Sequence, residues 1–273
     1  MLSLYIEEYR ACRVGKGAAL PRDPGERLAV AASAERSPRH IPTYTTIDLL
    51  DTLLAETDWF PLLLSLKVAA VATLLAMAAG ITLGWLFART RLPGRSVLEP
   101  FFMLPLVLPP TVMGYGILLL AGRRGPLGAW LRETFDYTII FSWHGAVVAS
   151  AIAALPLVMK SAGAAFAGVD RTLEAAASTL RQSRLSVFLR VTLPMAWPGI
   201  LAGSLLAFAR AMGEFGASLM VAGSIPQQTQ TLSMAIYDTV QAGEDDRALL
   251  LVIVTALVSM TVLLLSNRLF AFR

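Results

Sequence analysis

A pair of opposite charges lies within one of the most apolar parts of the chain. Arg210 and Glu214 are four residues apart, a spacing that places both side chains on one face of a helix. A charge in apolar surroundings usually faces a partner or water. The simplest interpretation is therefore an ion pair buried at a helix or subunit contact. The alternative is that the Arg210 guanidinium attracts an anion transiently, while Glu214 keeps that attraction weak.

A second polar cluster, EAAASTLRQSRLSVFLRVTLP at residues 174–194, lies between two long apolar runs. Asp170 can cap the start of a helix, and Glu174 then lies in the first turn, where the helix dipole favours an acid. The three alanines at 175–177 form helix readily and allow another backbone to approach closely. The pattern alone leaves two interpretations open: a helix in the headgroup layer of a membrane, or a helix that docks to another protein.

Residues suited to covalent or metal chemistry are scarce. The chain has one cysteine, Cys12, and two histidines, His40 and His144, which excludes a disulfide framework and a multi-histidine metal site. The GKG at 15–17 lacks the spacing of a phosphate-binding loop. We therefore expect no catalytic residue, no metal and no cofactor on this chain.

The composition is that of a membrane protein. Of the 273 residues, 56% are hydrophobic and only 15% are charged, against about 25% charged in soluble domains. Because about 20 apolar residues span the hydrocarbon core of a bilayer as a helix, each long apolar run predicts one span. The five runs are 68–88, 100–122, 137–159, 191–209 and 248–266. We expect the fourth to continue past Arg210 and Glu214 to about Val221. The predicted fold class is all-α, a polytopic membrane protein with about five transmembrane helices.

The second apolar run, 100–122, contains several helix-breaking residues, among them Pro109 and Pro110, which Thr111 and Gly114 follow. Proline removes a backbone hydrogen bond, so such a helix bends or breaks and exposes carbonyl groups. In a membrane this is tolerated where the backbone is buried in protein or faces a water-filled cavity. The segment is either a packing kink or part of the lining or gate of a pathway.

Two further patterns predict helix contacts. Small residues recur in the fourth run, where they would allow close packing in lipid. They are Gly199, Ala202, Gly203, Ala207 and Ala211. In the loop at 222–247, four apolar residues have helical spacing and predict an interfacial or re-entrant helix. They are Leu232, Ala235, Ile236 and Val240.

The distribution of lysine and arginine predicts the orientation of the chain. With the N-terminus outside, the inner segments hold ten basic residues and the outer loops hold four. The inner ten are Arg89, Arg91, Arg95, Lys160, Arg171, Arg181, Arg184, Arg190, Arg268 and Arg273. The outer four are Arg123, Arg124, Arg132 and Arg247. The positive-inside rule therefore places the N-terminus outside and the C-terminus in the cytoplasm. The basic residues form no continuous patch, so we expect no nucleic-acid partner.

Residues 1–57 differ from the rest of the chain because charges and four prolines interrupt them. They contain no apolar core of the kind that a signal peptide needs. We expect a poorly ordered tail, and an alternative is that it includes upstream sequence from a mis-assigned start. Residues 58–273 are then the transmembrane domain, with a long cytoplasmic loop at 161–190.

Residues 174–194 resemble the EAA loop of ABC-transporter permeases, a glutamate-alanine-alanine start followed at a fixed distance by a hydrophobic-x-Leu-Pro end. Counted back from Leu193 and Pro194, the usual glycine of the family falls on Arg181. Its glutamate falls on Ala175, so that Glu174 is one position early. The segments 104–120, 206–226 and 229–243 are similar to the molybdate permease subunit. The resemblance covers roughly residues 60–268.

This resemblance implies a type I ABC importer permease fold, with a coupling helix that docks to a separate ATP-hydrolysing subunit. The chain would be a transport subunit and not an enzyme, with ATP and magnesium on the partner. The coupling residues would be Asp170, Glu174, Ala175, Ala176, Ala177, Leu180, Arg181, Arg184, Leu193 and Pro194. The pathway or gate residues would be Pro109, Pro110, Thr111, Gly114, Arg210 and Glu214.

The expected partners are a cytoplasmic ABC ATPase, a periplasmic or surface oxyanion-binding protein, a second copy of the chain and the lipid of the inner membrane. Five helices with few polar inward residues enclose a poor channel, so we expect a two-fold homodimer with the pathway along its axis. The expected cargo is molybdate, with tungstate accompanying it.

Three alternatives are a sulfate or thiosulfate permease, a stand-alone secondary transporter or channel, and a membrane enzyme. A secondary transporter would need its own coupling-ion site and would leave residues 174–194 unexplained. A membrane enzyme would need convergent His, Cys, Asp or Glu side chains.

Overall fold

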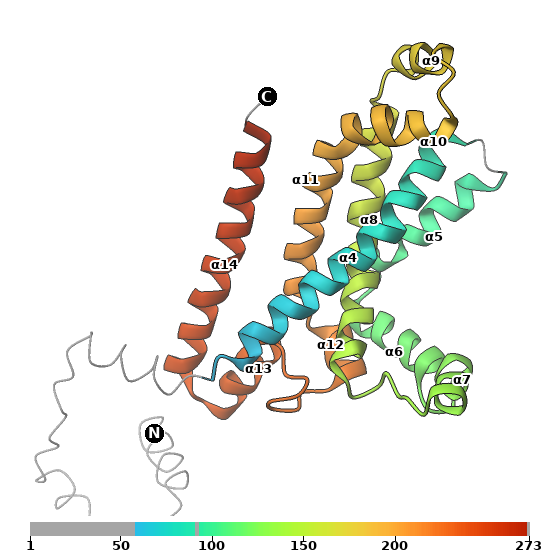
Figure 1. The fold of residues 1–273 in the computed structure, drawn as a ribbon. Helices are drawn as coiled ribbons and strands as arrows, with labels where there is room; N and C mark the ends of the chain where they lie inside the picture. The colour runs from blue at the N-terminus through green and yellow to red at the C-terminus, as the bar shows by residue number, and fades with distance from the viewer. Residues whose placement is uncertain (1–57, 91–92, 272–273) are drawn as a thin grey trace, which may run out of the picture. The chain divides into compact units, whose positions relative to one another are not determined.

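Every regular element of the described residues is a helix. The computed structural model describes residues 58–90 and 93–271 (Figure 1). In chain order the elements are α4 (Phe60–Arg89), α5 (Arg95–Val107), α6 (Pro110–Ala121), α7 (Pro126–Phe135), α8 (Trp143–Ala167), α9 (Arg171–Thr179), α10 (Arg184–Val187), the π-helical turn η1 (Phe188–Thr192), α11 (Leu193–Met212), α12 (Gly216–Ala222), α13 (Leu232–Ala242) and α14 (Asp245–Ala271). The predicted all-α class is confirmed for these ranges. The tail predicted at 1–57 lies outside the described residues.

Three long helical segments correspond to the first, third and fourth predicted spans. The helices α4 and α8, and the continuous run from Arg184 to Met212, are each long and apolar enough to cross a bilayer. The fifth predicted span lies within α14, a single helix of 27 residues. At about 1.5 Å of rise per residue, such a helix exceeds the roughly 30 Å of a hydrocarbon core.

The second predicted span is not one straight helix. It consists of α5 and α6, and the chain bends by 113° at the break between these two helices. Leu108 and Pro109 between them have extended backbones, with ψ of 141° and 137°. Pro109 and Pro110 cause this break, because proline has no N–H to donate and disfavours the helical conformation of the residue before it.

The fourth predicted span ends earlier than expected. The helix α11 stops at Met212, and residues 213–215 separate it from the short helix α12. The expectation of a helix continuing to about Val221 was therefore wrong. Gly213 is the first residue of the interruption and Gly216 follows it at the start of α12. Glycine weakens a helix because its backbone loses more freedom on folding.

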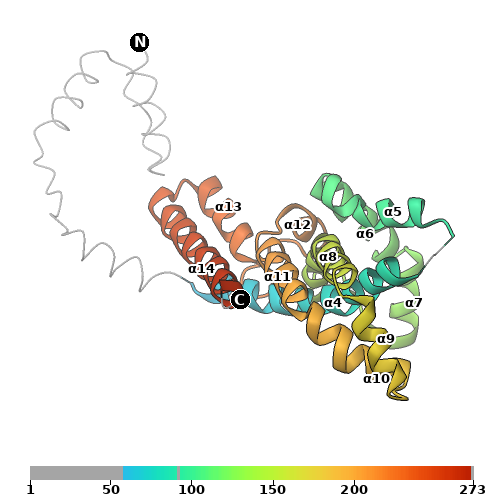
Figure 2. The same ribbon diagram turned by 90° about the horizontal axis from the view of Figure 1, so that it is seen from above.

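The helix α8 is the centre of the bundle, with α4 and α11 packed against it (Figure 2). A Cβ added to Gly84 of α4 would lie 2.8 Å from the backbone nitrogen of Gly163 and from the backbone oxygen of Met159. A Cβ added to Gly203 of α11 would lie 2.3 Å from that of Ser161. Only glycine permits backbones to approach so closely, which is how helices associate in lipid.

The predicted stripe of small residues in the fourth run therefore packs against another helix of the same chain. A Cβ on Gly199 would lie 2.8 Å from the Cβ of Ala165, and Ala207 and Ala211 are buried. The predicted close helix contact is present, and its partner is α8. The helix predicted in the loop at 222–247 is also present, as α13.

The contact between α4 and α8 can be tested with one added methyl group. Gly84→Ala should lower the free energy of unfolding by about 1–3 kcal/mol, because an extra carbon must be forced into a filled contact. Gly116→Ala is the matched control, since nothing lies within 4 Å of its added Cβ and alanine favours helix by up to about 1 kcal/mol. Thermal unfolding of the purified chain in detergent measures both. If Gly84→Ala melted at the same temperature as Gly116→Ala, the close contact between α4 and α8 would be contradicted.

Candidate functional site

The helix α9 begins with the predicted cap. The backbone N–H of Thr172 donates a hydrogen bond of 2.8 Å to the Asp170 carboxylate, and Glu174 lies in the first turn. The hydrogen bonds from Thr172 hold the pKa of the Asp170 carboxyl below its ordinary value. A carboxyl with a lowered pKa stabilises the fold above its ordinary pKa and loses that effect as the pH falls through the folded value. The cap is therefore complete at neutral pH.

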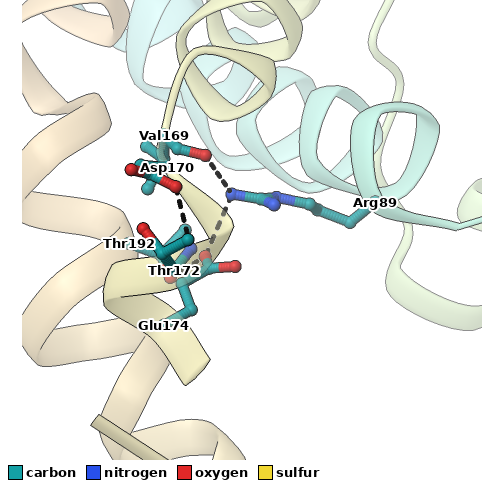
Figure 3. A network of polar contacts seen from close by, with 6 residues as sticks. All are labelled: Arg89, Val169, Asp170, Thr172, Glu174 and Thr192. Carbon is teal, nitrogen blue, oxygen red and sulfur yellow. Dashed lines mark hydrogen bonds and ion pairs between the residues drawn. The ribbon is translucent and has the colours of Figure 1, made fainter. Parts of the chain in front are cut away.

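Glu174 is the point at which three segments meet (Figure 3). Its Oε1 accepts a hydrogen bond of 3.0 Å from the Arg89 guanidinium and one of 2.6 Å from the Thr192 hydroxyl. The same Arg89 nitrogen lies 3.4 Å from the Val169 carbonyl oxygen. Arg89 ends α4 and Thr192 ends η1, so one carboxylate holds α9 to both neighbouring helices. Such charge-assisted bonds are stronger than neutral ones.

The loop exposes small and apolar residues among its polar ones. Ala175 and Ala176 are exposed, whereas Ala177 is half-buried. Leu180 at the end of α9 is 74% exposed, and Leu185 in α10 is 67% exposed. Alanine leaves room for close approach and the exposed leucines supply apolar area, a combination typical of a protein-docking surface.

The turn after α9 has the conformation that a glycine would favour. Arg181 has a φ of +56°, in the left-handed region that costs about 1–2 kcal/mol for a residue with a Cβ. The turn therefore persists although arginine replaces the expected glycine. Arg184 then begins α10, and Leu193 and Pro194 begin α11 directly after the π-helical turn η1, a local distortion of the kind found at a proline within a continuous helical run.

The second cluster confirms the predicted ion pair. The Arg210 guanidinium lies 2.6 Å from the Glu214 carboxylate, whose other oxygen accepts the backbone N–H of Ala217 at 3.0 Å. The Glu214 side chain is only 1% exposed, and that of Arg210 is 31% exposed. Because α11 ends at Met212, the two residues do not share a helix face as expected. Glu214 instead holds the start of α12 and leaves part of the guanidinium accessible.

The two helix breaks lie against each other. A Cβ on Gly216 would lie 2.9 Å from the Cβ of Pro110, and a Cβ on Gly114 would lie 2.7 Å from that of Met220. Gly114 is buried in this contact, whereas Pro109, Pro110 and Thr111 are exposed. The predicted pathway residues of α6 therefore adjoin the segment that Arg210 and Glu214 order. An accessible guanidinium beside interrupted helices can attract an anion without enclosing it.

Of the predicted coupling residues, Glu174, Ala175 and Arg184 line one pocket together with Arg89, the contributor that the sequence interpretation missed. It was counted only as a charge at the end of the first span. The available clue was Glu174, an acid in a loop rich in arginine. Within the described residues, no group of three or more His, Cys, Asp or Glu side chains is placed to hold a metal ion.

Comparison with known proteins identifies the family. Residues 80–273 match the family described as binding-protein-dependent transport system inner membrane component. The chain belongs to this family. It is a transport subunit of the inner membrane that crosses the bilayer several times.

Two relatives illustrate the similarity. The Escherichia coli K12 protein named molybdenum transport system permease protein ModB is 43% identical over 214 residues, which cover 78% of this chain and 93% of the relative. The Bacillus subtilis protein named putative molybdenum transport system permease protein YvgM is 40% identical over 216 residues, covering 79% and 95%.

Solved structures support the fold. A bacterial ABC transporter for alginate import matches with a TM-score of 0.62 at 16% identity, covering 90% of this chain and 88% of the other. The methionine ABC transporter MetNI matches with a TM-score of 0.55 at 15% identity, covering 81% and 98%. The predicted type I ABC importer permease fold is confirmed.

The contacts of Glu174 can be tested by a double-mutant cycle. Arg89→Gln and Glu174→Gln should each accelerate hydrogen exchange of the α9 amides, because each leaves a partly buried charge without its partner. The double variant should be little worse than either single one, with a coupling energy of about 0.5–3 kcal/mol. Arg171→Gln on the same helix is the control, since Arg171 forms no ion pair among the described residues. Additive effects of the two substitutions would contradict a direct ion pair.

Proposed function

We propose that this chain is the permease subunit of an ATP-driven molybdate importer. The observation that carries the proposal is the 43% identity to a molybdenum transport permease over 93% of that protein's length. The Mycobacterium tuberculosis ModB, 45% identical over 205 residues, adds support. These relatives favour molybdate over the alternatives of sulfate or thiosulfate. Tungstate is part of the proposal as a companion cargo.

The proposed energy source is a separate cytoplasmic ATPase that docks on α9. The exposed alanines and leucines of the loop would form the contact, and the Glu174 carboxylate would transmit its movement. Because α4 and η1 are both held by this carboxylate, a displacement of α9 would move the ends of two membrane helices together. ATP binding would then favour one of two conformations of the bundle.

The proposed pathway runs past the two helix breaks. Arg210 would attract the oxyanion through its accessible guanidinium, and Glu214 would keep the attraction weak enough for release. A nearly neutral pair suits a pathway better than an isolated cation, because a tightly bound anion would not leave.

The proposed arrangement has the N-terminus outside and the C-terminus in the cytoplasm. A second copy of the chain would complete the pathway along a two-fold axis. A periplasmic or surface binding protein would deliver the oxyanion to the outer face, and α13 lies in the loop expected there. The family description, which names binding-protein-dependent transport, supports such a delivery protein.

Uptake of labelled molybdate tests the proposal. Cells lacking only this chain should lose molybdate uptake at limiting concentration, and the intact chain should restore it. Excess sulfate should compete weakly, because the proposed cargo is molybdate. Full competition by sulfate would favour the sulfate alternative. Restored uptake without any co-purifying nucleotide-binding subunit would favour a secondary transporter.

Replacing the accessible guanidinium separates the two interpretations of the Arg210–Glu214 pair. Arg210→Gln should reduce molybdate uptake about tenfold or more, corresponding to about 1.4 kcal/mol of lost anion attraction, while assembly with the ATPase is retained. Arg247→Gln is the control, because Arg247 also forms an ion pair near a helix start, with Glu244 at 3.4 Å. Loss of assembly in Arg210→Gln would instead support a purely structural role.

A further inference from the structure

A cavity of about 370 Å³ lies between α4, α5 and α8, a volume within the range of ligand sites. It lies toward the end of the bundle from which α8 leads into α9. None of the residues discussed above for coupling or for the pathway lines it. Several of its lining residues are exposed, including Ala164 and Ala167, so a ligand can enter from the side of the bundle.

One wall of the cavity is apolar and made largely of small residues. This wall is formed by Gly84 and Ala88 of α4 and by Gly163, Ala164 and Ala167 of α8, along the line where the two helices touch. Phe87 and Met159 complete this wall, and both are buried. The wall offers no polar side chain to a ligand, so hydrocarbon is the material that fits it best.

The opposite rim carries two cations and one carboxylate. Lys160 Nζ lies 2.5 Å from Glu99 Oε1, and Arg95 Nε lies 3.2 Å from Glu99 Oε2. The Lys160 side chain is 55% exposed and that of Arg95 is 49% exposed. One carboxylate cannot neutralise two cations, so the rim keeps one net positive charge. Ammonium and guanidinium groups also have further N–H donors to offer.

We propose that this cavity binds one anionic phospholipid. Its phosphodiester carries a single negative charge, which matches the net charge of the rim, and would accept hydrogen bonds from Lys160 and Arg95. One acyl chain would lie along the wall of glycine and alanine. Basic pockets between membrane helices on the cytoplasmic side bind anionic headgroups in this way.

The main competing interpretation is that Lys160, Glu99 and Arg95 only fasten α5 to α8. The helix α5 has no buried residue, so such a fastening would be useful. A purely structural contact between α5 and α8 would, however, need only one of the two cations, and it would not explain the apolar cavity beside the ion pairs. A free phosphate ion could use the same donors, but the hydrocarbon wall would then have no occupant.

Whether Glu99→Gln raises or lowers the retention of an anionic lipid distinguishes lipid binding from a purely structural contact. If the cations bind a phosphodiester, Glu99→Gln removes a competing anion and should increase retention of phosphatidylglycerol about fivefold. Lys160→Gln and Arg95→Gln should each decrease it about fivefold, the effect of about 1 kcal/mol per basic residue near an anionic lipid. If the three residues only fasten α5, all three substitutions should act in the same direction.

Native mass spectrometry of the full chain in detergent with added phosphatidylglycerol measures the retention. Phosphatidylcholine with the same acyl chains should be retained equally by all variants. Arg132→Gln on α7 is the matched control and should change nothing, because Arg132 is exposed and outside the cavity. If Lys160→Gln does not fold, Arg95→Gln carries the test, since Arg95 lies on the exposed first turn of α5. Displacement of the lipid by excess inorganic phosphate, or loss of retention in Glu99→Gln, would overturn the proposal.

Discussion

The close approach of α8 to α4 and α11 is the constraint on which the remaining structure depends. In lipid there is no hydrophobic force between helices, so their association relies on shape. Gly84 and Gly203 supply that shape by allowing backbone or Cβ contact with α8 at distances that no larger residue permits. Because the ends of α4 and α11 are thereby placed beside the end of α8, Arg89 and Thr192 come within hydrogen-bond distance of one carboxylate on α9. The loop that carries α9 is thus positioned by packing that takes place well inside the bundle.

Hydrophobic run length predicted the helices well, because spanning a bilayer imposes a minimum number of apolar residues. It predicted the interruptions less well. The interruption at Pro109 was expected as a bend or a break, but its angle of 113° was not, because the packing of α6 against α12 is in no local pattern. The early end of α11 was missed because residues 213–215 are only three residues between two apolar segments. Run length cannot separate such a break from a continuous helix.

The site shows the same division between local and distant causes. The Asp170 cap and the first-turn position of Glu174 follow from adjacent residues, and both were predictable. The partner of Glu174 was not, since Arg89 lies 85 residues away in the sequence. The resemblance placed the family's glycine on Arg181, but the left-handed turn there was not predicted, because nothing in an arginine suggests a positive φ. Contacts across the bundle therefore need the structure, whereas helix caps can be predicted from sequence.

Two of the ion pairs that fasten this bundle stand at a helix end and at a helix break. Arg89 and Glu174 join the end of α4 to α9, and Arg210 and Glu214 join α11 to α12. A helix interior in lipid satisfies its own backbone, whereas a helix end leaves polar groups that need partners. Charges placed there satisfy those groups and each other. An arrangement of rigid spans tied by polar ends can move as linked bodies, because the ends can exchange partners at less cost than the packed interiors can be separated. This is the mechanical property that a subunit driven from its cytoplasmic loop would require.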